Sequence, residues 1–220
     1  MILASLLAIA ALPDGGRLTA GTTCYAIMRD ASVIGATWQS VRPIEVAGEA
    51  AWDVVVHQRV GDAFDLRDHF VLARKDLRPL AFDSRKLGKE HVTLRYANGR
   101  IAGSRVEKGV AVPVDLAAPN PVWEGNLWGL TFGALPLADG GEYSLPFYQY
   151  DKGFGTFTLK VTGSETVETS EGRVDAWTVD VGTGSDRRVT YLIGKVDGAE
   201  LGTRAPGFAT RLGGDCTGLE

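Results

Sequence analysis

Repeated alternation of apolar and polar residues is the feature that most constrains the fold of this chain. In the segment Ala51–Val60, the side chains of Trp52, Val54 and Val56 point to one side of a strand, and the residues between them point to the other. The dipeptide Asn98-Gly99 follows another alternating segment and is typical of a type I′ hairpin turn. Further segments with this period are Tyr25–Arg29, Val33–Arg42, Phe64–Leu72, Leu80–Lys86, Glu142–Tyr150, Thr156–Thr162, Val174–Val181, Arg188–Lys195 and Ala199–Gly202. The pattern predicts a mainly β protein with roughly ten or eleven strands in an antiparallel sheet.

One segment departs from this period and reads as a helix, Pro121–Leu135. It places Trp123, Leu127, Leu130 and Ala134 at spacings of four, three and four, which puts all four side chains on one stripe. A helix of this kind packs its apolar stripe against the sheet. A strongly curved sheet with one helix on its concave face encloses an apolar space.

Composition supports one folded domain and excludes a nucleic-acid partner. The chain has 220 residues, of which 45% are hydrophobic and 23% charged, which is enough to fill a core. The formal net charge is −4, and no basic patch is present, whereas nucleic-acid-binding domains carry clustered positive charge.

The first residues, MILASLLAIAALP, resemble an export signal. Ala8-Ile9-Ala10 gives the small-x-small pattern that signal peptidase accepts, although no Lys or Arg precedes Arg17. The apolar run is shorter than the ~20 residues of a membrane-spanning helix, so no transmembrane segment is expected. A buried first strand or helix is the structural alternative. We expect residues 1–23 to form a leader and linker, residues 24–220 to form the domain, and the protein to be periplasmic or otherwise exported.

The two cysteines, Cys24 and Cys216, lie near opposite ends of the expected domain. In an exported protein they are candidates for one disulfide, and two unpaired thiols are the alternative. The sequence leaves both arrangements open.

Several phrases resemble an uncharacterised bacterial domain family whose fold is related to the periplasmic lipoprotein carriers of the LolA and LolB type. The phrases are Leu77-Arg78-Pro79-Leu80, Ala134-Leu135-Pro136-Leu137, the turn Gly140–Tyr143, VTGSETVETSEGRVDAWTVDV and VTYLIGK followed by ELG. They extend over about residues 50–205. The resemblance implies a half-barrel, LolA-like sheet with a helix on its concave face and a cavity that takes acyl chains in the carriers. This chain departs from the carriers in having one helix candidate only, where they have more helical cover.

Seven side chains are the candidate ligand contacts of such a cavity. They belong to the helix segment and to the strand expected to face it: Trp123, Leu127, Trp128, Leu130, Phe147, Tyr148 and Tyr150. Aromatic rings offer a large contact area, and Tyr and Trp add a polar group that orients a ligand. A plain core, in which these rings bury one another, is the alternative.

The sequence contains no catalytic signature, so we expect a protein that is not an enzyme and needs no cofactor. No Gly-x-Ser-x-Gly phrase and no metal-ligand spacing is present. His57, His69 and His91 read as solvent-facing strand residues. A hydrolase built on Asp and His would need His57 or His69 bonded to a carboxylate at the mouth of the cavity.

The expected function is therefore the binding of a lipid or other hydrophobic ligand by an exported cell-envelope protein. A non-catalytic envelope scaffold, which contacts another envelope protein, is the alternative. Cavity volume distinguishes the two.

Overall fold

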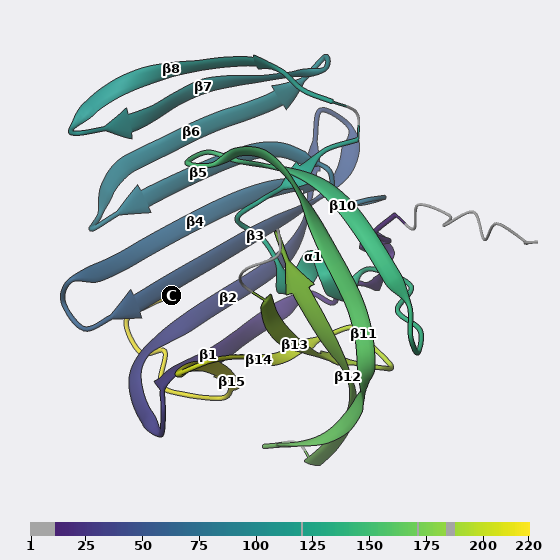
Figure 1. Cartoon of the computed structure of the whole chain (residues 1–220). Coiled ribbons are helices and arrows are strands. Elements are labelled where there is room, and N and C mark those ends of the chain that lie inside the picture. The colour runs from purple at the N-terminus through teal and green to yellow at the C-terminus, as the bar shows by residue number, and fades with distance from the viewer. Residues whose placement is uncertain (1–11, 120, 171, 184–187) are drawn as a thin grey trace, which may run out of the picture.

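The chain forms one large, curved and open β-sheet (Figure 1). The computed structural model describes residues 12–119, 121–170, 172–183 and 188–220, and these residues contain fifteen strands. The first eight are β1 (Gly21–Arg29), β2 (Ser32–Val46), β3 (Glu49–Val60), β4 (Phe64–Ala73), β5 (Pro79–Lys86), β6 (Lys89–Ala97), β7 (Arg100–Glu107) and β8 (Val110–Ala117). The others are β9 (Trp123–Glu124), β10 (Glu142–Gln149), β11 (Gly153–Thr169), β12 (Gly172–Gly182), β13 (Arg188–Gly194), β14 (Glu200–Ala205) and β15 (Phe208–Leu212). The mainly β prediction is confirmed.

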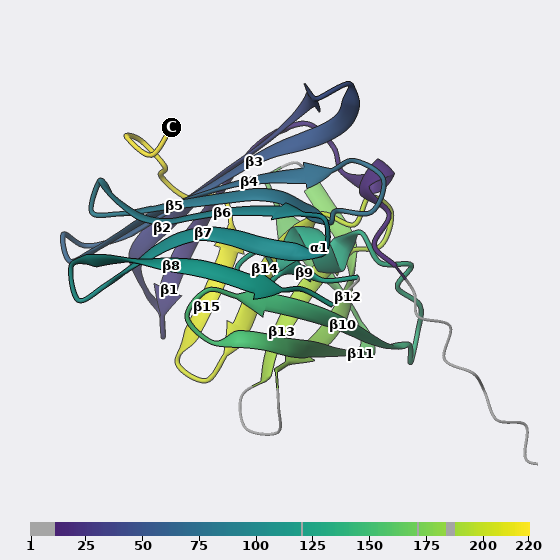
Figure 2. The ribbon, with the colours of Figure 1, turned by 90° about the horizontal axis from the view of Figure 1, so that it is seen from above.

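The first and last strands pair with each other in the middle of the sheet. The strand order runs from β8 back to β1, then from β15 back to β9. β1 and β15 are antiparallel, with Ala26 opposite Arg211 and Arg29 opposite Phe208. This pairing joins two arms, β1–β8 and β9–β15, and the second arm crosses over one face of the first (Figure 1). The view from above shows β9 and the short helix α1 (Gly129–Gly133) between the arms (Figure 2).

The main core fills the space between the two arms. Phe70 and Phe82 of the first arm belong to the same buried cluster as Phe157 and Ile193 of the second. All four side chains are completely buried. The residues that alternate with the three phenylalanines are half-buried or exposed, as the period of two predicts, whereas the neighbours of Ile193 are buried. The expected Asn98-Gly99 turn is present, with φ values of 51° and 69°.

The helix is much shorter than the predicted Pro121–Leu135. Trp123 and Glu124 instead form β9, which is parallel to β10 and lies opposite Phe147 and Tyr148. Glycine recurs every fourth residue at 125, 129 and 133, and each glycine lowers helix stability by about 1 kcal/mol relative to alanine. Backbone pairing with β10 therefore replaces the first turns of the expected helix. No helix in the described residues is both long and apolar enough to cross a membrane.

The residues just before β1 belong to the folded domain, where a linker was expected. Gly15–Arg17 forms a 3₁₀ turn, and its first residue is fixed from two sides. The indole N–H of Trp52 donates to the Gly15 carbonyl oxygen (2.9 Å), and the Gly15 amide donates to the Lys75 carbonyl oxygen (3.1 Å). The predicted leader before this turn lies mostly in residues 1–11, outside the described residues.

A disulfide between Cys24 and Cys216 fastens the C-terminal segment to β1, with a Cα–Cα distance of 5.9 Å. Of the two arrangements that the sequence left open, the structure has the bonded one. The segment after β15 is also held by hydrogen bonds. The Gly213 amide donates to the Cys24 carbonyl oxygen (2.8 Å), and Nδ1 of His57 lies 2.8 Å from the Leu219 carbonyl oxygen.

Candidate functional site

The seven predicted ligand contacts lie in or against the main core. Trp123, Phe147 and Tyr148 have at most 3% of their surface exposed. The ring centroid of Phe157 lies 4.1 Å from that of Phe147 and 4.9 Å from that of Trp128. These rings therefore pack against one another, as the core alternative described. Their role in ligand binding stays a prediction.

A cavity of about 510 Å³ lies beside this core, and of the seven predicted residues it is lined by Leu130. Its walls come from residues 17–20, the first half of β1, β2, α1, the end of β11, the start of β12, and the turn between β13 and β14. Leu18, Val41, Leu130 and Leu201 supply apolar surface. The volume lies within the range of roughly 300–1,000 Å³ that is usual for small-molecule sites.

The cavity lies where the sheet is incomplete. β15 pairs with β1 only along Ala26–Arg29, so within the described residues the first half of β1 has no strand on that side. Beyond the pairing, Gly213 bonds the Cys24 carbonyl and the Ala26 amide. In an antiparallel strand, alternate residues direct their backbone groups to the same side, so Thr22 directs its amide and carbonyl groups towards the same gap. Thr22 is exposed and lines the cavity.

Glu200, the first residue of β14, brings a carboxyl group to the cavity wall. Within the described residues, its side chain makes no hydrogen bond and no ion pair. Burial raises the pKa of Glu200 to about 7. Burial also raises the pKa values of the neighbouring Tyr25 and Tyr191 well above the usual value, so both phenols stay neutral. The cavity therefore contains a carboxyl group that is protonated in a large fraction of molecules near neutral pH.

A close approach of the backbone makes room for this carboxyl group. A Cβ atom placed on Gly129 would lie 1.5 Å from Oε2 of Glu200. Similarly, a Cβ atom on Gly133 would lie 1.9 Å from the Gly198 carbonyl oxygen. The glycines that shorten the helix thus allow α1 to lie directly on the β13–β14 turn.

A second buried carboxyl group, Glu124 of β9, lies away from the cavity lining. The Tyr96 hydroxyl donates to Oε2 (2.5 Å), and Nδ2 of Asn126 donates to Oε1 (2.6 Å). Burial raises the pKa of Glu124 to about 7 and that of the nearby Asp68 to about 6. Glu124 is held by three donors from two residues, including the Asn126 amide (3.2 Å), so we regard it as a structural group.

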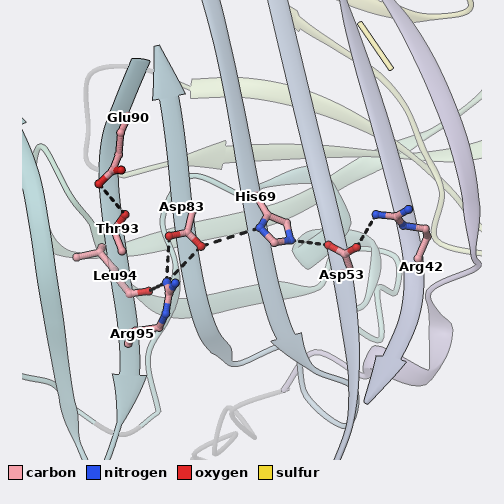
Figure 3. A network of polar contacts seen from close by, with 8 residues as sticks. All are labelled: Arg42, Asp53, His69, Asp83, Glu90, Thr93, Leu94 and Arg95. Carbon is pink, nitrogen blue, oxygen red and sulfur yellow. Dashed lines mark hydrogen bonds and ion pairs between the residues drawn. The ribbon is translucent and has the colours of Figure 1, made fainter. Parts of the chain in front are cut away.

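Two of the three histidines that the sequence placed in solvent, His57 and His69, have carboxylate partners on the outer face of the first arm. The third, His91, is half-buried, and its ring centroid lies 5.4 Å from that of Tyr150. Nε2 of His69 lies 2.5 Å from Oδ1 of Asp53, and Asp53 also accepts from Arg42 (2.7 Å; Figure 3). His57 is buried, and its Nε2 lies 3.1 Å from Oδ1 of Asp65. These pairs satisfy the distance for an Asp–His hydrolase but lie outside the cavity lining, away from its mouth. In the described part of the chain, no group of three or more His, Cys, Asp or Glu residues is arranged to hold a metal.

A family of proteins of unknown function, DUF3108, matches residues 25–206. The chain belongs to the DUF3108 family. No curated protein and no solved structure matches it significantly. The DUF3108 region includes the second half of β1 and all of β2 to β14, and therefore Glu200 of the cavity, while Arg17 and the disulfide residues lie outside it. The family is uncharacterised and supplies no catalytic feature.

The sequence analysis missed Arg17, Gln39 and Glu200 as polar groups of the cavity. Arg17 lies in the segment read as a linker, and Glu200 begins a strand that was assigned only a structural role. The one feature of the sequence that could have indicated a role for Glu200 is its position as a single acidic residue between the apolar Ala199 and Leu201.

Proposed function

We propose that this DUF3108 protein binds a lipid or another hydrophobic small molecule in the 510 Å³ cavity beside α1. The observation that carries the proposal is the cavity itself, which combines leucine and valine side chains with a few polar groups. Small-molecule sites usually have this composition, because apolar contact supplies affinity and isolated polar groups fix orientation. The protein acts by binding and performs no chemistry of its own.

We place this function in the cell envelope. The signal-like start of the sequence and the Cys24–Cys216 disulfide support export, because disulfides persist in oxidising compartments. The resemblance to the periplasmic lipoprotein carriers supports a half-barrel that holds acyl chains. The curved open sheet is compatible with such a half-barrel, with α1 on the concave side.

The proposal is tested by native mass spectrometry of gently purified protein and by titration with a fluorescent acyl probe. Ala20 is exposed and lines the cavity, so Ala20→Trp is expected to fill it without disturbing the core and to weaken probe binding at least tenfold. Ala102→Trp, at an exposed position of β7, is the matched control and should bind like the unaltered protein. Absence of bound lipid together with absence of probe uptake would overturn the proposal.

An envelope scaffold is the second candidate, and the edge strand β8 favours it. Val110 and Leu116 of this strand are 65% and 37% exposed. An exposed edge offers unpaired backbone groups to a partner strand, although Pro113 removes one donor. Capture of a partner by the protein with an unoccupied cavity would support this function.

A further inference from the structure

The cavity contains an arginine whose side chain has no partner in the part of the chain that the structure describes. Arg17 lines the cavity from the end of the 3₁₀ turn. Among the described residues, its guanidinium group makes no hydrogen bond and no ion pair, and its Nε atom is buried without a partner. Nine other arginines form ion pairs with carboxylates. Arg17 differs from the other described arginines in that its Nε atom is buried without a hydrogen-bond partner.

The backbone that leads into Arg17 is fixed by hydrogen bonds, so this side chain extends from a rigid base. The Asp14 side chain accepts from the Gly16 amide (2.9 Å), and the Asp14 amide donates to the Ala134 carbonyl oxygen (2.8 Å). The Arg17 amide donates to the Asp14 carbonyl oxygen (3.1 Å). A binding group on a rigid support loses little conformational freedom when a ligand arrives.

We infer that the cavity recognises an amphiphile with an anionic oxygen head group, a carboxylate or a phosphate, through the guanidinium group of Arg17. The inference rests on the proposed function and names the class of ligand. The guanidinium group has no acceptor among the described residues, and carboxylate and phosphate oxygens are the acceptors that match guanidinium geometry best. Leu18 follows Arg17 directly and lines the same cavity with Leu130, so an apolar chain attached to the head group has a surface to cover.

The acidic groups that line the cavity do not prevent Arg17 from binding an anionic head group. Asp197 is exposed, and its Oδ1 accepts from the Ala199 amide (3.0 Å). Glu200 is protonated in a large fraction of molecules near pH 7, and its neutral form does not repel an anion. Tyr25 and Tyr191, which face Glu200 from β1 and β13, remain neutral. Among the described residues that line the cavity, Arg17 is therefore the one permanent cation that an anionic head group meets.

The test compares dodecanoate, dodecyl phosphate and dodecanol by isothermal titration calorimetry at pH 6.5, with acetate and inorganic phosphate as head groups alone. We expect at least one of the two anionic amphiphiles to bind at least tenfold more tightly than dodecanol, and the head groups alone to bind much more weakly. Arg17→Gln should abolish this preference while leaving dodecanol binding unchanged. Arg85→Gln, at an exposed position of β5, is the matched control and should keep it.

The outcomes separate this inference from the proposed function. Equal binding of acid and alcohol by the unaltered protein, or a preference that survives Arg17→Gln, overturns the role of Arg17 but leaves a hydrophobic site. Tight binding of acetate or inorganic phosphate alone overturns the amphiphile. Absence of binding by all three long-chain compounds overturns the proposed function itself. Thermal unfolding of both variants establishes that they are folded, and Arg17→Lys, which keeps the charge, is a second variant that should retain part of the preference.

Discussion

The carboxyl group of Glu200 lies directly against the backbone of Gly129, where a Cβ atom would be 1.5 Å from Oε2. The two residues come from α1 and β14, which are distant in the sequence. Only glycine at position 129 allows the helix and the carboxyl group to occupy their present places. The contact between Gly129 and Glu200 therefore determines both how closely α1 approaches β14 and where the carboxyl group lies in the cavity wall.

Gly129→Ala is expected to destabilise the protein by about 2 kcal/mol, because the added methyl group overpacks this contact. Urea unfolding measures the change. Glu200→Ala should relieve the clash, so the double variant should be more stable than the two single effects predict, by at least about 1 kcal/mol. Additive effects would show that Gly129 is needed for a reason other than this contact.

The raised pKa of Glu200 predicts a loss of stability as the pH rises. The pKa is about 7 in the folded protein and 4.5 for an unperturbed glutamate, so the folded state binds this proton more tightly than the unfolded state does. The stabilisation is complete below pH 4.5 and is lost as the pH rises to about 7. Glu200→Gln should therefore flatten the fall in unfolding free energy between pH 5 and pH 8 by roughly 1–3 kcal/mol. Glu124 and Asp68, whose pKa values are also raised, should leave a smaller fall of the unfolding free energy with pH in this variant. If the fall were as steep as in the unaltered protein, the assignment to Glu200 would be wrong.

Reduction of the Cys24–Cys216 disulfide is expected to cost roughly 5 kcal/mol of stability, since the bond closes a loop across a sequence separation of 192 residues. Cys24→Ser/Cys216→Ser should unfold at the same urea concentration as the reduced protein. Thiol titration in denaturant checks that the unaltered protein carries no free cysteine. Two reactive thiols in protein purified under oxidising conditions would exclude the bond.

Export predicts a defined mature N-terminus. Signal peptidase cleavage after Ala10 would fall before the described residues, and N-terminal sequencing of exported protein should begin at Ala11. Deletion of residues 1–11 should leave the unfolding free energy unchanged. Deletion of residues 1–20 should lower it by about 2 kcal/mol or more, because the Trp52 indole loses its acceptor at Gly15. Equal stability of the two forms would restore the linker interpretation of the segment before β1.

The strands could be predicted from the sequence because each has one face in the core. In β3, Trp52 and Val54 are buried on the same side, so the period of two is visible without any knowledge of the partner strands. The same analysis missed β15, and it assigned β9 to a helix. The two residues of β9 are too few to show a period, and their apolar spacing to Leu127 imitated a helical stripe.

The cavity could not be predicted because its residues meet only in three dimensions. Arg17 and Glu200 are far apart in the sequence, and neither lies in a motif. The aromatic residues near Trp128 gave the stronger sequence signal, but rings fill a core as readily as they line a pocket. The sequence could not decide whether the cysteines form a disulfide for a similar reason, since the bond depends on the approach of Cys216 to Cys24 in the finished fold.

The pairing of β1 with β15 has a consequence for biosynthesis. Strands β1 to β8 are joined by short hairpins and can pair in the order in which they are made, whereas the free side of β1 must wait for nearly the last residues of the chain. The β1–β15 pairing cannot form before nearly the whole chain has been made, and contacts between distant residues form more slowly than local hairpins. The sheet is therefore completed in a late step, when β15 docks against strands that have already paired.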